Sequence, residues 1–389
     1  MTKEQNAFIQ ILADHINGRK TRIDEDLDWE IIYNYARTHQ VSGMVCQQCE
    51  NSIPHNLVDD FQKELMATLY YGSKRDKELQ TIKRELNIEK IPFFIVKGPV
   101  VANLYPIPHL RSMGDIDLVI HNEDRDKCNG LLIARGYTCL SRQSDREWQY
   151  SKHILELELH DRLVYEEAVN EKNQAAFFND CWRFVKDGQL DWNFHLLFLI
   201  FHLRKHLMNS GIGFRHFLDL AVVAQHIDID WGYVAKSLAT TGMIDFARKC
   251  YGFIYKWFGI ETPLFESIDE VFFEEATNKI FVDGVFGFNN PDNLHNVLIN
   301  EVRKKKLPRV KMIRLALQKI FPSHKELENT EPYTYLNKNS FLLPFAWLHR
   351  TIRGIRRDKG ETLLVSLKKS FIADENIERR NAMLKKWGL

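Results

Sequence analysis

The stretch Asp115-Ile116-Asp117-Leu118-Val119-Ile120 decides the fold of this chain, because it has the composition of a buried strand that begins with two carboxylates. Side chains alternate between the two faces of a strand, so Asp115 and Asp117 project from the same face, with Cα atoms about 7 Å apart. Two like charges on one face raise each other's pKa unless a cation neutralises them. A bound Mg²⁺ or Mn²⁺ ion explains the pair, because such ions take carboxylate oxygens as ligands. The alternative is a solvated strand edge, so the surrounding sequence has to support the metal site.

The residues before this strand predict another strand that ends in a turn. Residues 91–96 are mostly β-branched and aromatic, and Lys97-Gly98-Pro99 closes the run. Where a strand ends at a glycine before a helix, backbone N–H groups can approach phosphate oxygens, and basic side chains can neutralise them. Lys97, Gly98 and the nearby Arg111 are therefore candidates for contacts with a nucleoside triphosphate.

A third carboxylate is predicted on a later strand, after a helix over residues 122–134. Residues 154–160 alternate, with leucines on one face and Glu156, Glu158 and His160 on the other. A third acid beside the Asp-x-Asp pair would complete a two-metal site and could accept the proton of an attacking hydroxyl. Glu158 is the preferred candidate, and His160 is expected to support it or the acceptor. Both glutamates are also compatible with a solvated sheet face.

The remaining sequence predicts helices on both sides of this sheet. Apolar residues recur at helical spacing in residues 7–16, 29–39, 57–86, 194–208, 214–226 and 233–258. The expected fold class is α+β, with a small mixed β-sheet core flanked by an N-terminal helical region and a C-terminal helical domain. The predicted boundaries are 1–90 for the N-terminal helices, 91–190 for the core, 191–300 for the helical domain and 301–389 for a basic helical region.

Cysteine usage and hydropathy predict a cytoplasmic location. The six cysteines are scattered, and the polar residues 1–6 do not resemble the start of a secretory signal. Cys46 and Cys49 form a CxxC pair without a second pair at zinc-finger spacing, which favours structural thiols over a metal site. No apolar run approaches the roughly 20 residues that a spanning helix needs, so we expect no transmembrane segment.

Charge is distributed unevenly along the chain. Residues 301–389 contain 21 Lys and Arg against 9 Asp and Glu, a net charge of +12, which leaves −11 for residues 1–300. The basic residues gather in two clusters, Arg303 to Lys306 with Arg309, Lys311 and Arg314, and Arg350 with Arg353, Arg356 and Arg357. Nucleic acid, an acidic protein or an anionic membrane surface would be attracted to them. Alternatively, this region packs across the acidic part of the same chain.

Several motifs together resemble one known family. They are Lys97-Gly98, Tyr105-Pro106, Arg111-x-x-Gly114-Asp115-Ile116-Asp117-Leu118, Gly136-Tyr137 and Glu158-Leu159-His160. This series resembles the uncharacterised nucleotidyltransferase family of the polymerase-β superfamily, whose pattern joins a strand ending in Gly-Gly or Gly-Ser, an Asp-x-Asp strand and a later third acid. Pro99 departs from that pattern, since serine or glycine often follows the first glycine and contacts the triphosphate. The resemblance covers about residues 30–260, including His202-x-x-x-His206, Arg215 and Asp219-Leu220-Ala221.

The histidines allow rival interpretations. His202 and His206 have the spacing at which two imidazoles share a metal, but Leu203 stands where a zinc protease has its glutamate, so a core or interface pair is favoured. A metal phosphohydrolase of the HD type would use His153, His160-Asp161 and Asp219, but it requires His-Asp on a helix and leaves the Asp-x-Asp pair unexplained. Asp219 is instead expected to form an i,i+4 ion pair with Arg215, which could otherwise orient an anionic substrate.

The resemblance implies a palm-like mixed sheet, dependence on Mg²⁺ or Mn²⁺, and transfer of a nucleoside monophosphate from a triphosphate such as ATP. The predicted catalytic residues and metal ligands are Asp115, Asp117 and Glu158, and the predicted triphosphate contacts are Lys97, Gly98 and Arg111. Two alternatives stay open, a catalytically inactive protein of the same fold that binds a nucleotide or a partner, and the phosphohydrolase. The acceptor, a hydroxyl or a phosphate group, is not identified by the sequence.

Overall fold

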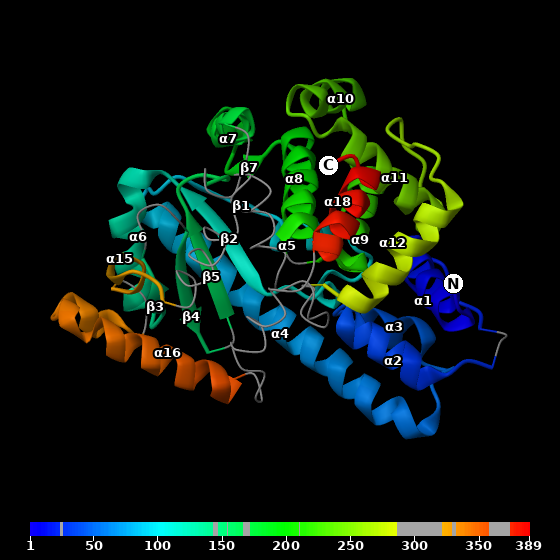
Figure 1. The fold of residues 1–389 in the computed structure, drawn as a ribbon, viewed down its shortest axis with the longest axis horizontal. Coiled ribbons are helices and arrows are strands. Elements are labelled where there is room, and N and C mark those ends of the chain that lie inside the picture. Colours follow the sequence, from blue (N-terminus) through cyan, green and yellow to red (C-terminus); the bar gives the residue numbers. More distant parts are fainter. Residues whose placement is uncertain are drawn as a thin grey trace.

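A mixed β-sheet lies on one side of the molecule and a helical region on the other, and the long helix α4 extends past both (Figure 1). The chain is therefore of the predicted α+β class. The computed structural model describes residues 1–23, 26–142, 147–153, 155–165, 172–209, 211–285, 321–328, 332–357 and 374–389.

The larger sheet has five strands in the order β1-β2-β5-β4-β3. They are β1 (Phe93–Val96), β2 (Asp115–Ile120), β3 (Thr138–Ser141), β4 (Trp148–Lys152) and β5 (Leu155–His160). β2 pairs antiparallel with β1 and parallel with β5, and the other pairs are antiparallel, so the sheet is mixed. β1, β2 and β5 lie where the sequence predicts strands. The sequence does not predict β3 and β4, because neither contains a long enough run of alternating apolar and polar residues.

The two faces of this sheet have different surroundings. The isoleucine and leucine side chains of β2 share a core with α4 (His55–Ile88) and α6 (Arg125–Ala134). Alternation turns Asp115 and Asp117 to the opposite face. Helix α8 (Trp192–Asn209) approaches the end of β1 on that side through a hydrogen bond to the backbone of Lys97. The carboxylates thus lie between the sheet and the helical region.

Helices that precede the sheet in the sequence and helices that follow it pack together in one hydrophobic core. The helices are α1 (Lys3–Ile16), α2 (Trp29–Thr38), α3 (Ser42–Cys49), α7 (Lys172–Asn179), α9 (Phe214–His226), α10 (Trp231–Thr240), α11 (Ile244–Phe258) and α12 (Glu270–Asp283). Phe8 of α1 contacts Phe214 of α9 and Phe281 of α12. Near the C-terminus, Trp387 stacks on Phe253 with 4.7 Å between ring centroids. Both ends of the chain therefore contribute to the helical core.

Short elements connect these parts. They are α5 (Gly98–Val101), η1 (Ala102–Leu104), η2 (Pro108–Leu110), η3 (Asn122–Asp124), η5 (Cys181–Phe184) and the two-stranded sheet of β6 (Val185–Lys186) and β7 (Gln189–Leu190). After residue 285 the described elements are α15 (His324–Leu327), η7 (Thr334–Asn337), η8 (Ser340–Leu342), α16 (Leu343–Arg357) and α18 (Asp374–Lys386).

Two helical segments differ from the sequence prediction. The continuous pattern over residues 233–258 forms two helices, because Gly242 adopts a positive φ of 67° after α10 and ends it. Helix α3 is additional and contains Cys46 and Cys49, both buried and free. Burial raises the pKa of Cys46 to about 11 and that of Cys49 to about 12, as expected for structural thiols.

The C-terminal basic clusters fall largely outside the described residues. This holds for Arg303 to Lys306, Arg309, Lys311 and Arg314, and for the side chains of Arg353, Arg356 and Arg357.

Among the helices that the structure describes, none combines the length and the apolar character that crossing a membrane requires.

Candidate functional site

The candidate site lies where β2 and β5 run side by side. Their parallel register pairs Asp115 with Glu156 and Asp117 with Glu158. Paired positions on neighbouring strands point to the same face, and His160 follows two positions later on that face. The structure therefore brings the predicted third acid next to the Asp-x-Asp strand.

Lys97 turns its ammonium group toward Asp117. Its Nζ lies 2.6 Å from Asp117 Oδ1, and Asp117 is 1% exposed. The backbone of Lys97 has φ 58° and ψ −125°, a conformation that side chains with a Cβ atom rarely adopt. The Lys97 N–H donates a 2.9 Å hydrogen bond to Nε2 of His195 on α8. This hydrogen bond helps to hold the strained turn that aims Lys97 at the carboxylate.

His160 contacts two carboxylates with one ring nitrogen. Its Nε2 lies 3.1 Å from Asp117 Oδ1 and 3.4 Å from Glu158 Oε2. Burial by itself would lower the pKa of His160, but the hydrogen bonds to Asp117 and Glu158 raise it to about 9. In this arrangement the imidazole is protonated at neutral pH, and its Nε2–H donates to the carboxylates.

The two aspartates of β2 have opposite pKa shifts. Burial, followed by the charge of Asp117, raises the pKa of Asp115 to about 6. Burial also acts to raise the pKa of Asp117, but Lys97 and His160 outweigh it and hold that pKa well below its usual range. The raised pKa of Asp115 indicates that the site still favours additional positive charge.

Asp117, Glu158 and His160 together could hold a metal ion. Each offers one ligand atom, and these atoms all lie within 4.8 Å of one another. Mg²⁺ prefers oxygen ligands, whereas an imidazole nitrogen beside carboxylates also suits Mn²⁺ and other transition metals. Of the predicted ligands, Asp117 and Glu158 belong to this group. The third member of the group is His160 and not Asp115, although Asp115 lies on the same face of β2.

Gly98 and Arg111 lie against each other beside the Lys97 turn. A Cβ atom on Gly98 would be only 3.0 Å from Arg111 Nη1, so glycine allows the close approach. Arg111 is 6% exposed, and its Nε and Nη2 donate to the carboxylate of Asp219 at 2.9 and 2.6 Å. Tyr105 donates to the same carboxylate at 2.8 Å. The observed partner of Arg111 is thus Asp219 of α9, and its contact with a triphosphate stays a prediction.

Arg215 joins helix α9 to two other segments. Its Nη1 donates to Gln40 Oε1 at 2.7 Å and to the Ser112 carbonyl oxygen at 3.1 Å. Burial and the neighbouring charge of Arg111 lower the pKa of Arg215 to about 10. Together with the ion pair between Arg111 and Asp219, these contacts attach α9 to the loop that leads into β2.

The residues of the rival hydrolase site do not form a ligand group within the described structure. His160 is the last residue of strand β5 and Asp161 follows it, so neither residue lies on a helix. The carboxylate of Asp219 accepts hydrogen bonds from Arg111 and Tyr105. His153 is exposed at the turn between β4 and β5. The described geometry therefore favours the carboxylate site on β2 and β5.

Helix α8 lines the Lys97 side of the site. His195, Phe198 and His202 recur at helical spacing on one face, and Lys97 Nζ lies 5.9 Å from the Phe198 ring centroid. His202 Nε2 and His206 Nε2 are 3.2 Å apart. Burial and the charge of Lys97 hold the pKa of His202 well below its ordinary value. No group of three or more metal ligands among the described residues includes this pair.

The sequence around His195 does not predict its contact with the Lys97 turn. It lies in an apolar run, where a buried histidine is usually a core residue, and the hydrogen bond to Lys97 emerges only in the structure. One signal is available in the sequence. The seven-residue spacing from His195 to His202 places both on the same helix face.

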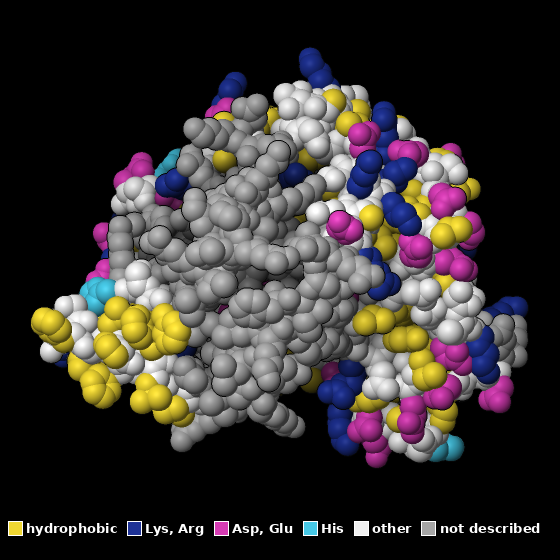
Figure 2. All heavy atoms as spheres, viewed as in Figure 1, with side chains coloured by type: hydrophobic (Ala, Val, Ile, Leu, Met, Phe, Trp, Pro, Cys, Tyr) yellow, Lys and Arg dark blue, Asp and Glu magenta, His cyan; other side chains and the backbone are white. Residues whose placement is uncertain are grey.

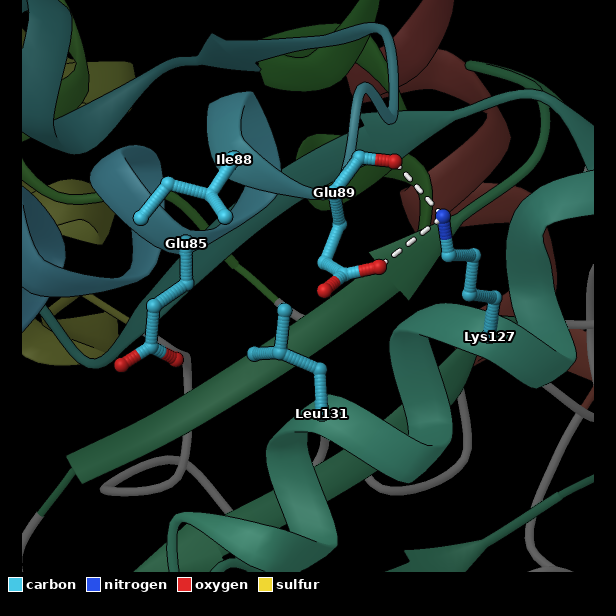
Figure 3. Close-up of a pocket in the computed structure, with 5 residues that line it drawn as sticks. All are labelled: Glu85, Ile88, Glu89, Lys127 and Leu131. Carbon is cyan, nitrogen blue, oxygen red and sulfur yellow. Dashed lines mark hydrogen bonds and ion pairs between the residues drawn. The ribbon is translucent and has the colours of Figure 1, made fainter.

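A separate pocket lies on the other side of the sheet, between the end of α4 and α6 (Figure 3). Its lining residues are Glu85, Ile88, Glu89, Lys127 and Leu131. Lys127 Nζ lies 3.0 Å from Glu89 Oε2, so the charges in this pocket already pair with each other. None of the predicted site residues lines it, and we assign it no role in catalysis.

A family model described as an uncharacterised nucleotidyltransferase matches residues 25–259 of the chain. The matched region contains the whole five-stranded sheet, the Lys97 turn and helices α8 and α9. No curated protein and no solved structure matches the chain.

Proposed function

Because this chain belongs to that uncharacterised nucleotidyltransferase family, we propose that it transfers a nucleoside monophosphate from a nucleoside triphosphate, such as ATP, to an acceptor. The acceptor contributes a hydroxyl or a phosphate group. The reaction depends on a divalent metal ion, and the carboxylates of β2 and β5 form its centre.

One observation carries the proposal, the pairing of Asp117 with Glu158 across parallel strands, with Asp115 on the same face. Lys97 adds a cation 2.6 Å from Asp117. Nucleotidyl transfer requires positioned carboxylates and positive charge against phosphate oxygens, and it does not require a covalent protein nucleophile. This combination of groups meets both requirements.

The residues present fit a divalent cation, since two carboxylates and an imidazole offer ligand atoms within 4.8 Å of one another. We assign Asp115, Asp117 and Glu158 as ligands of Mg²⁺ or Mn²⁺, and His160 as a further ligand after its imidazole has lost the Nε2 proton. When bound, the ion supplies positive charge to phosphate oxygens that become more negative during the reaction.

Side chains and backbone groups of the protein supply the base and the contacts with the triphosphate. Glu158 accepts the proton of an acceptor hydroxyl while the hydroxyl oxygen forms a bond to the α-phosphorus. The bond from this phosphorus to the oxygen that bridges to the β-phosphate breaks, and pyrophosphate leaves with the electron pair. Lys97 and the backbone at Gly98 face the triphosphate. Arg111 is placed beside Gly98, where Asp219 orients its guanidinium group.

A nucleotide- or partner-binding protein without turnover is the second candidate. Pro99 follows Gly98 and offers the triphosphate neither an N–H group nor a hydroxyl. In addition, Lys97 already pairs with Asp117. This candidate predicts metal-dependent nucleotide binding without transfer of label from the α-phosphate, whereas a phosphohydrolase predicts phosphate release without a labelled acceptor.

Calorimetric titration of each nucleoside triphosphate, with and without Mg²⁺ or Mn²⁺, tests the proposal without knowledge of the acceptor. The variant combines Asp115→Asn with Asp117→Asn, and the matched control combines Asp59→Asn with Asp60→Asn on the surface of α4. We expect metal-dependent binding to wild type and control and a loss of at least roughly tenfold in affinity in the variant. Absence of binding to any triphosphate would contradict the proposal, and binding without α-phosphate transfer to any acceptor would favour the second candidate.

A further inference from the structure

An apolar row on helix α16 is not explained by nucleotidyl transfer. Phe345, Leu348 and Ile352 are 66%, 57% and 43% exposed, and Phe341, just before the helix, is 88% exposed. Residues at this spacing lie on one face of a helix. Figure 2 shows hydrophobic side chains gathered at the end of the molecule where α16 lies in Figure 1. We call Phe341, Phe345, Leu348 and Ile352 the apolar row.

The apolar row is not the side by which α16 packs onto its neighbours. Ala346 is fully buried in a small core with Leu327, Tyr333 and Leu336. Trp347 packs against this core, and its Nε1–H donates a 2.9 Å hydrogen bond to the carbonyl oxygen of Pro322. The helix therefore already has a packed side. The apolar row is a second apolar surface, and it faces outward.

The charge of this segment identifies the kind of surface that fits the row. Residues 332–357 contain no Asp or Glu, and their basic residues are Lys338, Arg350, Arg353, Arg356 and Arg357. Arg350 is exposed. A segment that combines an exposed row of Phe, Leu and Ile with several arginines and no acidic residue is typical of helices that lie in the interface of an anionic membrane. Leu348 and Ile352 have no aromatic face for base stacking, which argues against nucleic acid as the partner of the row.

We propose that α16 docks the protein on an anionic lipid surface. The apolar row inserts at the level of the lipid headgroups and the first carbons of the acyl chains. Arg350 and the other arginines of the segment are attracted to the lipid phosphates. The helix lies along the membrane and does not cross it. This role is independent of the proposed nucleotidyl transfer, since no residue of the carboxylate site takes part in it.

Vesicle flotation of the full chain tests the proposal. The vesicles contain phosphatidylcholine alone or an equal mixture with phosphatidylglycerol, at low and at high salt. The test variant combines Phe345→Ser with Leu348→Ser, and a second variant is Arg350→Glu. The matched control combines Val271→Ser with Val282→Ser, which replaces residues of α12 that are 64% and 58% exposed. All these side chains are exposed, so the variants are expected to fold.

We expect wild type and control to float with anionic vesicles at low salt and to bind less at high salt. The Phe345→Ser and Leu348→Ser variant should lose at least roughly tenfold in the partition coefficient, and Arg350→Glu should lose severalfold on anionic vesicles only. Absence of wild-type binding, or equal binding by the apolar variant, would overturn the proposal. It would also be overturned if the apolar substitutions changed only the oligomeric state, or only binding to an oligonucleotide.

Discussion

Lys97 Nζ lies 2.6 Å from Oδ1 of Asp117, so an ammonium group faces a carboxylate that is 1% exposed. A buried carboxylate stays ionised only beside compensating charge, and Lys97 and His160 provide it here. Under the proposed function Lys97 therefore has two roles. It neutralises Asp117, and it contacts the triphosphate.

Replacing Lys97 with methionine tests the first role. Among the described residues, the Lys97→Met variant leaves Asp117 with His160 as its hydrogen-bonded cationic partner, so the pKa of Asp117 should rise. We expect the free energy of unfolding at pH 7 to fall by about 2 kcal/mol, because a buried ion pair loses one member. Urea denaturation without added metal measures this loss. Lys63→Met, at an exposed pair with Asp60, should change stability by less than about 0.5 kcal/mol, and a similar loss in both variants would argue against the role of Lys97.

The pKa of His160 predicts a pH dependence of stability. It is about 9 in the folded protein against an ordinary value of 6.5, so folding strengthens proton binding. The resulting stabilisation is fully present below pH 6.5 and is lost as the pH rises through 9. A shift of this size corresponds to about 3 kcal/mol at most. Urea denaturation of the metal-free protein at pH 6 and pH 9.5 should show a larger loss for wild type than for His160→Gln.

The exposed His153 provides the control for this experiment. His153→Gln should follow the wild-type pH profile, because the His153 imidazole lies outside the carboxylate site. If His160→Gln and wild type lose the same stability between the two pH values, proton binding at His160 does not contribute.

Replacing His160 with aspartate should change the metal preference of the site. His160 Nε2 lies within 4.8 Å of ligand atoms of Asp117 and Glu158, and an imidazole ligand favours Mn²⁺ over Mg²⁺. In His160→Asp the potential ligands are all oxygens, so the affinity ratio of Mn²⁺ to Mg²⁺ should fall by roughly tenfold. Paramagnetic resonance of bound Mn²⁺, with Mg²⁺ as competitor, measures this ratio. An unchanged ratio would show that the imidazole is not a ligand.

The ion pair between Arg111 and Asp219 should be important for stability. Asp219→Asn leaves Arg111 buried without a charged partner on α9, while an amide of similar shape remains. We expect a loss of about 3 kcal/mol in the free energy of unfolding. Asp228→Asn, at an exposed position near the end of the same helix, serves as control and should change little. Equal stability of the two variants would contradict a structural role for the pair.

Periodic segments could be predicted accurately from local sequence. The strand over residues 115–120 and the helix over residues 214–226 have the predicted bounds, because burial on one side or both sides leaves a regular apolar pattern. Short segments carry less information. β3 and β4 contain four and five residues, and tertiary contacts decide their pairing. The apolar spacing over residues 233–258 predicts one helical stretch, although the positive φ of Gly242 divides it into two helices.

Local alternation in the sequence placed Asp115 and Asp117 on one strand face, and Glu158 and His160 on one face of another strand. The tertiary structure decided that these strands are parallel neighbours with Asp117 opposite Glu158. It also decided that His195 contacts the Lys97 turn and that Arg111 pairs with Asp219. The physical reason is that periodicity sets the face on which a side chain lies, whereas strand register and ion-pair partners depend on contacts between segments far apart in the chain.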